Sequence, residues 1–151
     1  MQDNRVFSPI EGKFVKLQDV NDSTFNSGLM GIGFGVYPEA SSVLSPFNGE
    51  VTMVFPTRHA IGLRRKDGVE MLIHIGIETV NLGGKGFEAL VKSGEKVRKG
   101  QELIEFDKEL LLNEKLDPTI IVIFTNYENY KITINNQVDI SNKDVIAYAE
   151  K

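Results

Sequence analysis

Residues 59–75 read His59-Ala60-Ile61-Gly62-Leu63-Arg64-Arg65-Lys66-Asp67-Gly68-Val69-Glu70-Met71-Leu72-Ile73-His74-Ile75, and this stretch decides the fold. Two largely apolar runs flank the polar sequence Lys66-Asp67-Gly68, which supplies the positive φ that a tight turn needs. The stretch therefore predicts a β-hairpin in which a strand at 59–65 is joined to a strand at 69–75. The two strands carry the only two histidines of the chain, so we expect His59 and His74 to face one pocket.

Outside the hairpin, the chain continues with short runs rich in Val, Ile, Phe and Thr, separated by Gly, Pro and Asn-Asp turns. We predict further strands at residues 12–17, 32–37, 49–55, 102–106, 120–124, 130–134 and 145–149. Two segments look helical, 87–91 and 107–116, and Asp107 is the expected N-cap of the second. Many short strands with few helices predict an all-β sandwich or barrel-like fold with one or two short helices and protected edges.

One stretch of the sequence occurs twice. Ser8-Pro9-Ile10-Glu11-Gly12 resembles Ser45-Pro46-Phe47-Asn48-Gly49, which follows 37 residues later. In both copies Ser-Pro fixes an extended entry and Gly permits the bend into the next strand. A third segment, 94–100, has the Gly-x-x-Val-x-x-Gly spacing of turns in lipoyl- and biotinyl-type barrels. Quasi-repeated β units favour a duplicated, barrel-like sandwich.

Length and composition exclude several classes of protein. The 151 residues fit a single domain spanning 1–151, and the absence of cysteine excludes a disulfide scaffold, a thiolate zinc site and thiol catalysis. A net charge of −4 argues against broad nucleic-acid binding and would suit a basic protein partner. No segment has the roughly 18 apolar residues that a membrane helix needs, and no signal region follows the N-terminus. We therefore expect a cytoplasmic protein without membrane insertion.

His74 lies in the run Met71-Leu72-Ile73-His74-Ile75-Gly76-Ile77-Glu78-Thr79-Val80, where nearly every neighbour is apolar. An unpaired buried polar group costs about 1–3 kcal/mol, so something specific must hold this ring. Four interpretations are open for the two imidazoles: structural histidines with satisfied hydrogen bonds, a two-histidine metal site, acid–base catalysis on a small substrate, or a phosphorylatable histidine supported by the second ring.

Phosphorylation explains more of the local sequence than the other three interpretations. A phosphohistidine adds about 1.5–2 negative charges and needs donors nearby, which a ring N–H of His59 and the hydroxyl of Thr57 can supply. Gly76 removes a side chain beside His74 and opens an approach to the backbone. We expect an apolar rim that keeps water from the reactive phosphoramidate and serves as a docking surface. The residues predicted for this rim are Phe25, Leu29, Met30, Phe55, Leu72, Ile75 and Val80.

These residues resemble enzyme IIA of the glucose class of the bacterial phosphoenolpyruvate-dependent sugar phosphotransferase system. The resemblance runs from Ser8-Pro9 through Ser45-Pro46-Phe47-Asn48-Gly49, Thr57-Arg58-His59-Ala60 and Leu82-Gly83-Gly84-Lys85-Gly86-Phe87 to residues 91–107. Its most specific part is the apolar run that ends in His74-Ile75-Gly76-Ile77-Glu78-Thr79-Val80. The resemblance implies an antiparallel β-sandwich with Greek-key character, of the duplicated hybrid motif type.

The resemblance also implies the function. His74 would accept a phosphoryl group from the phosphocarrier protein HPr, as a tele-phosphohistidine, and pass it to the IIB domain of a glucose-type sugar permease. His59 would be the supporting donor, Thr57 part of the hydrogen-bond network, and the rim with Glu78 the docking face. No cofactor is implied, although in some relatives the two histidines complete a zinc site with a carboxylate from a partner. A monomer is expected, with regulatory targets as further partners.

Some positions depart from the expected family pattern. Arg58 replaces the usual Asn before the supporting histidine, Glu78 stands where Asp is common, and Ile75 replaces a frequent Phe. Ser23-Thr24 occupies a segment that is more apolar in well-known relatives. Phosphotransfer chemistry tolerates all of these changes, whereas affinities for partners do not carry over.

Two rival classes are weighed against this interpretation. A lipoyl- or biotinyl-type carrier presents a modified lysine at an exposed hairpin, and here Lys66 lies next to Asp67 without the matching motif. A peptidase of the LytM type has a similar fold, but its site needs more histidines than this chain has.

Overall fold

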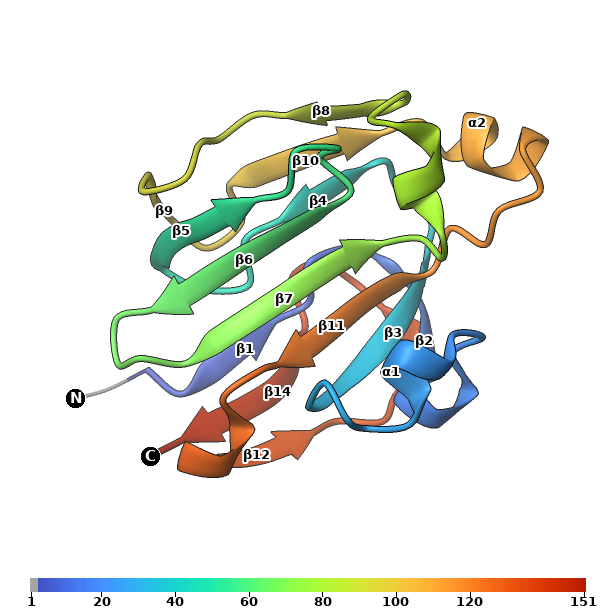
Figure 1. Ribbon diagram of the computed structural model, residues 1–151. Coiled ribbons are helices and arrows are strands. Elements are labelled where there is room, and N and C mark those ends of the chain that lie inside the picture. The colour runs from blue at the N-terminus through green and yellow to red at the C-terminus, as the bar shows by residue number, and fades with distance from the viewer. Residues whose placement is uncertain (1–2) are drawn as a thin grey trace.

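The computed structural model describes residues 3–151 as a β-sandwich with two short α-helices (Figure 1). The strands are β1 (Arg5–Phe7), β2 (Gly12–Lys16), β3 (Ile32–Pro38), β4 (Ser42–Leu44), β5 (Gly49–Val54), β6 (Ala60–Arg65), β7 (Glu70–Ile75), β8 (Phe87–Ala89), β9 (Lys96–Val97), β10 (Glu102–Phe106), β11 (Ile120–Phe124), β12 (Lys131–Ile134), β13 (Asp139–Ile140) and β14 (Val145–Glu150). The helices are α1 (Ser23–Asn26) and α2 (Lys108–Asn113), with 3-10 turns at Leu17–Asp19, Thr79–Leu82 and Tyr127–Asn129.

One large sheet organises the molecule. It has eight strands in the order β13-β2-β3-β11-β7-β6-β5-β9, and every pairing in it is antiparallel. Two antiparallel three-stranded sheets, β1-β14-β12 and β4-β10-β8, complete the sandwich (Figure 1). The order places the β6–β7 hairpin inside the large sheet, with β5 and β11 as its neighbours. The predicted all-β, antiparallel fold is confirmed.

The hairpin forms as the sequence predicted. In its turn the amide of Arg65 donates to the carbonyl of Val69 (2.8 Å), and the amide of Gly68 donates to the carbonyl of Arg65 (2.9 Å). Gly68 has a φ of +101° and a Cβ there would lie 2.8 Å from the hydroxyl of Tyr130, so glycine is needed on both grounds. That hydroxyl donates to the carbonyl of Asp67, which fixes the turn against the C-terminal part of the chain.

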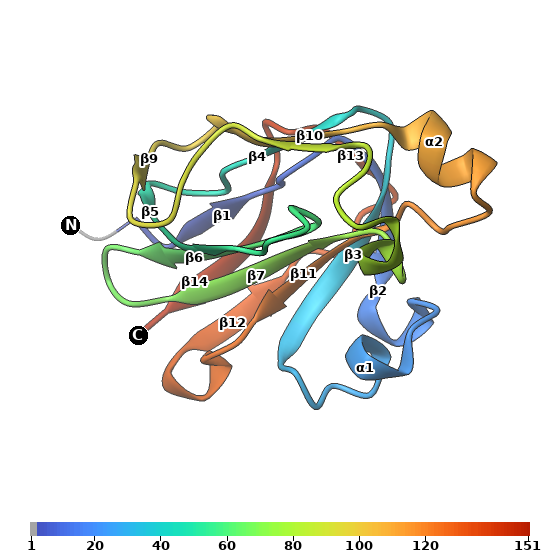
Figure 2. The same ribbon diagram turned by 45° about the horizontal axis from the view of Figure 1, so that its top comes forward.

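The two faces of β7 serve different purposes. Met71, Ile73 and Ile75 are buried in the main core between the sheets, whereas Leu72 and His74 project from the other face, as the period of two in a strand requires. On that outer face lies a second, smaller cluster, which the segment containing α1 covers (Figure 2). Its buried members are Val20, Phe25, Ile77, Ile121 and Ile123. The fold thus places His74 outside the main core, beside this second apolar cluster.

The repeated Ser-Pro sequence corresponds to a symmetric contact. The amide of Phe7 donates to the carbonyl of Pro46 (2.9 Å), and the amide of Leu44 donates to the carbonyl of Pro9 (2.7 Å), so the two copies bind each other reciprocally. Within each copy the buried serine hydroxyl closes a turn by donating to the carbonyl two residues on. The internal repeat therefore links the connection between β1 and β2 to the connection between β4 and β5.

One predicted element is wrong and one is confirmed. Residues 87–91 do not form a helix, because Phe87–Ala89 is the edge strand β8, in which Phe87 pairs with Phe106 and Ala89 with Ile104 of β10. The predicted helix at 107–116 is α2, and the carboxylate of Asp107 caps it by accepting from the amide of Leu110 (3.0 Å). No helix within residues 3–151 has the length and apolar character needed to cross a membrane.

We predict that Ser8→Ala and Ser45→Ala each lower the free energy of unfolding by about 1–3 kcal/mol, because each leaves a buried carbonyl without its donor. Both side chains are buried, and their hydroxyls donate to Ile10 (2.6 Å) and Phe47 (2.7 Å) respectively. Urea denaturation of both variants checks this prediction. Ser41→Ala, at an exposed position, is the matched control, and either test variant behaving like this control would contradict the equivalence of the two repeats.

Candidate functional site

The hairpin brings the two histidines together at its open end. Ala60, the first residue of β6, pairs with His74, and the amide of Ile75 donates to the carbonyl of His59 (2.7 Å). The ring centroids of His59 and His74 lie 4.8 Å apart and the ring planes meet at 80°. The two imidazoles are therefore in direct contact, edge to face.

One hydrogen bond fixes the tautomer of His74. Its Nδ1 lies 2.7 Å from the carbonyl oxygen of Gly76. A carbonyl oxygen only accepts, so Nδ1 carries the proton and donates it to this bond. In the neutral ring the lone pair then resides on Nε2, which is the nucleophilic nitrogen. The backbone two residues downstream thus determines which nitrogen of His74 can react.

The backbone around Gly76 is held rigidly. Gly76 has a φ of +76°, and a Cβ there would lie 2.5 Å from Cγ2 of Thr79 and 3.0 Å from the carbonyl oxygen of Asp117. The amide of Gly76 donates to the carbonyl of Thr119 (2.9 Å), and the amide of Ile77 donates to the carbonyl of Asp117 (2.9 Å). The segment before β11 therefore buttresses the turn that orients His74, and glycine is required at its centre.

His59 is held by the turn that precedes β6. The hydroxyl of Thr57 lies 2.5 Å from Nδ1 of His59, and the ring of Phe55 contacts the imidazole edge-on with a centroid distance of 5.6 Å. Only 5% of His59 is exposed. With Nδ1 engaged by Thr57, its Nε2 is left for another partner. Thr57 lies in the turn between β5 and β6, and this turn brings its hydroxyl to the ring.

Burial keeps both rings neutral at physiological pH. Burial is the main cause that lowers the pKa of His74 from 6.5 to about 4, and the charge interaction with neighbouring His59 acts in the same direction. The carbonyl of Gly76 and the carboxylate of Asp22 act against this effect, because both favour the protonated ring. Burial likewise lowers the pKa of His59. At pH 7 His74 therefore presents an unprotonated Nε2.

The predicted apolar rim divides into a floor and an exposed edge. Phe25 of α1 is buried with its ring 5.0 Å from that of His74, and Leu72 packs in the same small cluster, so both form the floor. Leu29, Met30 and Val80, in the segments that follow α1 and β7, are 90%, 40% and 49% exposed, and we call these three residues the exposed edge.

The other residues predicted for the docking face, Phe55, Glu78 and Ile75, differ in burial. Phe55 is half-buried against His59, and Glu78 is exposed. The assignment of Ile75 to the rim is wrong, because its side chain is fully buried in the main core. Ile75 follows His74 directly in β7, so the alternation of the strand turns it to the opposite face.

Arg58 is bound to the backbone of a neighbouring loop rather than left free at the histidines. Its Nε donates to the carbonyl of Phe87 (3.0 Å) and its Nη2 to the carbonyl of Gly84 (3.0 Å). These bonds hold the loop after the Thr79–Leu82 turn against the segment that carries Thr57 and His59. Arg58 has a φ of +60°, in the left-handed region where Asn and Asp are enriched among non-glycine residues.

Several residues of the site were not found from the sequence. Asp22 caps α1 by accepting from the amide of Thr24 (2.9 Å) while its charge acts on His74. An Asp followed by Ser-Thr is a helix-start signal that could have revealed the cap. The carbonyls of Asp117 and Thr119 act through main-chain atoms, which leave no mark in the sequence. Among residues 3–151, no three or more His, Cys, Asp or Glu side chains are grouped as a metal site.

Known proteins resemble this chain in sequence and in fold. The profile of the family "phosphoenolpyruvate-dependent sugar phosphotransferase system, EIIA 1" matches residues 4–130. The chain is 44% identical over 122 residues to a PTS system glucose-specific EIIA component of Staphylococcus epidermidis, which covers 81% of this chain and 74% of that protein. It is 43% identical over 132 residues to one of Halalkalibacterium halodurans, covering 87% and 76% of the two chains.

A solved structure, the glucose permease IIA from Mycoplasma capricolum, superposes with a TM-score of 0.86 at 34% sequence identity. The superposition covers 95% of this chain and 93% of that one. Sequence and fold agree, and the chain belongs to the EIIA 1 family of the phosphoenolpyruvate-dependent sugar phosphotransferase system.

Proposed function

We propose that this chain acts in the cytoplasm as a phosphocarrier that accepts a phosphoryl group from phosphorylated HPr on Nε2 of His74 and transfers it to the IIB domain of a glucose-type sugar permease. The observation that carries the proposal is the bond from Nδ1 of His74 to the carbonyl of Gly76, which leaves Nε2 as the nucleophile. Membership of the family supports the role in sugar phosphotransfer, and the second imidazole at 4.8 Å supports the assignment of the site.

In the accepting step the lone pair on Nε2 of His74 attacks the phosphorus atom on the incoming phosphohistidine. The new N–P bond forms while the bond to the donor imidazole breaks, and the donor nitrogen keeps the electron pair. No proton has to leave Nε2 first, because the lowered pKa of His74 keeps the ring neutral. The imidazolium character that develops as the new bond forms is stabilised by the Gly76 carbonyl, which already accepts from Nδ1.

His59 is proposed to stabilise the charge of the phosphoryl group. If the Thr57 hydroxyl donates to Nδ1 of His59, the neutral ring carries its proton on Nε2, which can then donate to a phosphoryl oxygen on the neighbouring His74. Such a donor is oriented before the reaction begins, which is the arrangement that lowers a barrier most effectively. Phe25 and Phe55 cover the rings and limit access of water to the N–P bond.

One face is proposed to serve both partners. Leu29, Met30 and Val80 expose apolar surface beside the histidines, and the carboxylates of Asp22 and Glu78 add negative charge that suits a basic partner. Donor and acceptor would use this face in turn, which favours a monomer.

The two imidazoles supply two of the four ligands that zinc takes, so a zinc site would need a carboxylate from a partner. Regulatory targets would compete for the same face.

We predict a single phosphoryl adduct on the purified protein after incubation with phosphoenolpyruvate, enzyme I and HPr. The adduct should be labile in acid and stable in base, as expected for phosphate bound to nitrogen. Intact-mass measurement checks this, and His74→Gln should abolish the adduct. Label that persists in His74→Gln would contradict the assignment of the nucleophile.

We predict that His59→Gln still accepts the phosphoryl group on His74 but passes it on roughly 10²–10³-fold more slowly, because the transition state loses an oriented donor. Rapid-quench measurement of transfer from the labelled protein to a IIB domain checks the rate. Thr57→Val should show a smaller defect in the same step, since it only releases the orientation of His59. Onward transfer at the normal rate in His59→Gln would remove His59 from the mechanism.

The lowered pKa of His74 predicts a specific dependence of stability on pH. Above pH 6.5 the ring is neutral in both states, whereas between pH 6.5 and about 4 the unfolded chain binds a proton that the folded chain does not. The free energy of unfolding should therefore fall by up to about 3 kcal/mol through this window. His74→Gln lacks this contribution, and carboxylates common to both proteins cancel in the comparison. Parallel slopes for the two proteins between pH 7 and 4 would contradict the lowered pKa.

A further inference from the structure

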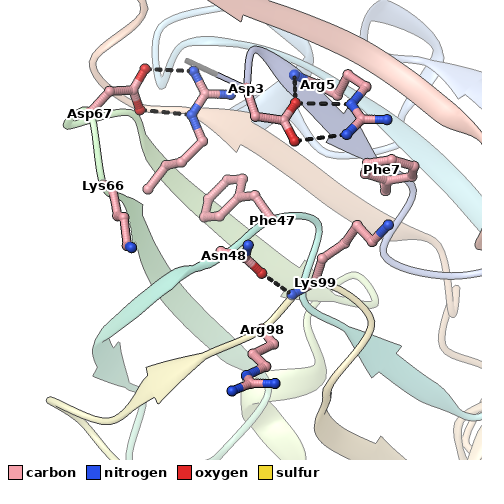
Figure 3. Close-up of a pocket in the computed structure, with 10 residues that line it drawn as sticks. Asp3, Arg5, Phe7, Phe47, Asn48, Lys66, Asp67, Arg98 and Lys99 are labelled. Atoms are coloured by element: carbon pink, nitrogen blue, oxygen red, sulfur yellow. Dashed lines mark hydrogen bonds and ion pairs between the residues drawn. The ribbon is translucent and has the colours of Figure 1, made fainter. Parts of the chain in front are cut away.

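A cavity of about 770 Å³ lies at the turn end of the β6–β7 hairpin, away from the histidines. It is lined by Asp3, Arg5, Phe7, Phe47, Asn48, Arg65, Lys66, Asp67, Arg98 and Lys99 (Figure 3). Arg65 and Ala60 end β6 on opposite sides, and five residues of extended strand separate them by about 17 Å. The cavity is therefore a place distinct from the His59–His74 site.

The charge of this cavity is opposite to that of the whole chain. Its lining contains five cationic side chains and two carboxylates, an excess of three positive charges, although the protein has a net charge of −4. Two of the cations are already paired, Arg5 with Asp3 (2.9 Å) and Arg65 with Asp67 (2.7 Å). Lys66, Arg98 and Lys99 form no ion pair with any residue of the described chain, 3–151. The uncompensated charge would attract an anion.

Arg65 is a fixed cation in the lining of the cavity. Only 5% of it is exposed, and its guanidinium is held by Asp67 and by the carbonyl of Ala149, to which Nη2 donates (2.6 Å). Its remaining nitrogen, Nη1, is buried and has no hydrogen-bond partner among residues 3–151. Buried donors are rarely left unpaired, and a nearby negative charge would compensate this one.

The walls of the cavity combine flexible cations with aromatic rings. Figure 3 shows Lys66 and Lys99 on opposite sides of Phe47. Phe47 is buried at 4% exposure, and the ammonium of Lys99 lies 4.1 Å from the ring centroid of Phe7. Lys66 comes from the hairpin turn, Lys99 from the turn after β9, and Phe47 from the second Ser-Pro repeat. Both turns were singled out in the sequence, and phosphotransfer at His74 uses neither.

We propose that this cavity binds a small phosphate ester, with the phosphate group between Lys66 and Lys99 above Arg65 and the organic part against Phe47 and Phe7. A phosphate monoester carries about two negative charges and three acceptor oxygens, which match flexible ammonium groups and a fixed guanidinium better than a single carboxylate does. The volume is in the range of small-molecule pockets. A polymeric anion such as nucleic acid is disfavoured, because the rest of the chain is acidic.

The test uses the full chain, with glucose 6-phosphate, inorganic phosphate and glucose as probes at constant ionic strength. Titrations followed by ¹⁵N–¹H NMR should shift the backbone amides of Lys66, Asp67 and Lys99 with glucose 6-phosphate and leave them unchanged with glucose. The ester should bind at least severalfold more tightly than inorganic phosphate, because only the ester can contact Phe47. Equal affinities would assign the cavity to free phosphate and overturn the proposal.

Substitutions distinguish binding in this cavity from binding at the two histidines. Lys66→Gln/Lys99→Gln should weaken binding of glucose 6-phosphate about tenfold or more, since two charge-assisted contacts are lost. Lys131→Gln, at an exposed position outside the cavity, is the matched control and should bind as the unaltered protein does. His74→Gln should also keep the affinity. Binding that survives the double substitution, or that disappears in His74→Gln, would overturn the proposal.

Discussion

The hydrogen bond from Nδ1 of His74 to the carbonyl of Gly76 is the constraint on which the site depends. Without it the imidazole could present either nitrogen, and neither ring orientation nor tautomer would be defined before a partner arrives. The bond exists because β7 ends at Ile75 and Gly76 turns the chain with a positive φ, which brings its carbonyl back toward the ring. Two carbonyls of the segment before β11, those of Asp117 and Thr119, hold that turn in place. A reactive side chain is thus oriented by main-chain groups, which are fixed by the fold itself.

The alternation of β7 explains why a histidine is tolerated in so apolar a run. Ile73 and Ile75 enter the main core, while His74 emerges on the other face beside a small cluster under α1. There the ring is dry enough for its pKa to fall to about 4, yet His74 remains partly exposed. A histidine inside the main core would be buried but could not be reached from solvent. The sandwich resolves this conflict because its large sheet carries a second apolar cluster on its outer face.

Local pattern was enough to predict the hairpin, the contact between His59 and His74, and the helix capped by Asp107, because each depends on residues close in sequence or joined by one tight turn. The short strands β1, β4, β9 and β13 were missed, since two or three residues carry no periodic signal and pair only when distant partners are present. The helix predicted at 87–91 failed for the same reason: β10 offers Phe87–Ala89 a pairing edge that local sequence does not reveal. Assigning Ile75 to the rim was avoidable, because neighbouring residues of one strand cannot share a face.

Two departures from the expected family pattern, Arg58 and Glu78, fall on positions with a φ of about +60°. Asn and Asp, the residues expected there, tolerate this left-handed conformation better than most others. At Arg58 the larger side chain gains two bonds to the carbonyls of Gly84 and Phe87, which offset the strain and tie a loop to the segment that carries His59. Glu78 makes no side-chain cap on the turn that it precedes and is exposed to solvent. Arg58 and Glu78 therefore share a left-handed backbone conformation beside the two histidines, but the side chain of Arg58 ties a loop whereas that of Glu78 is left in solvent.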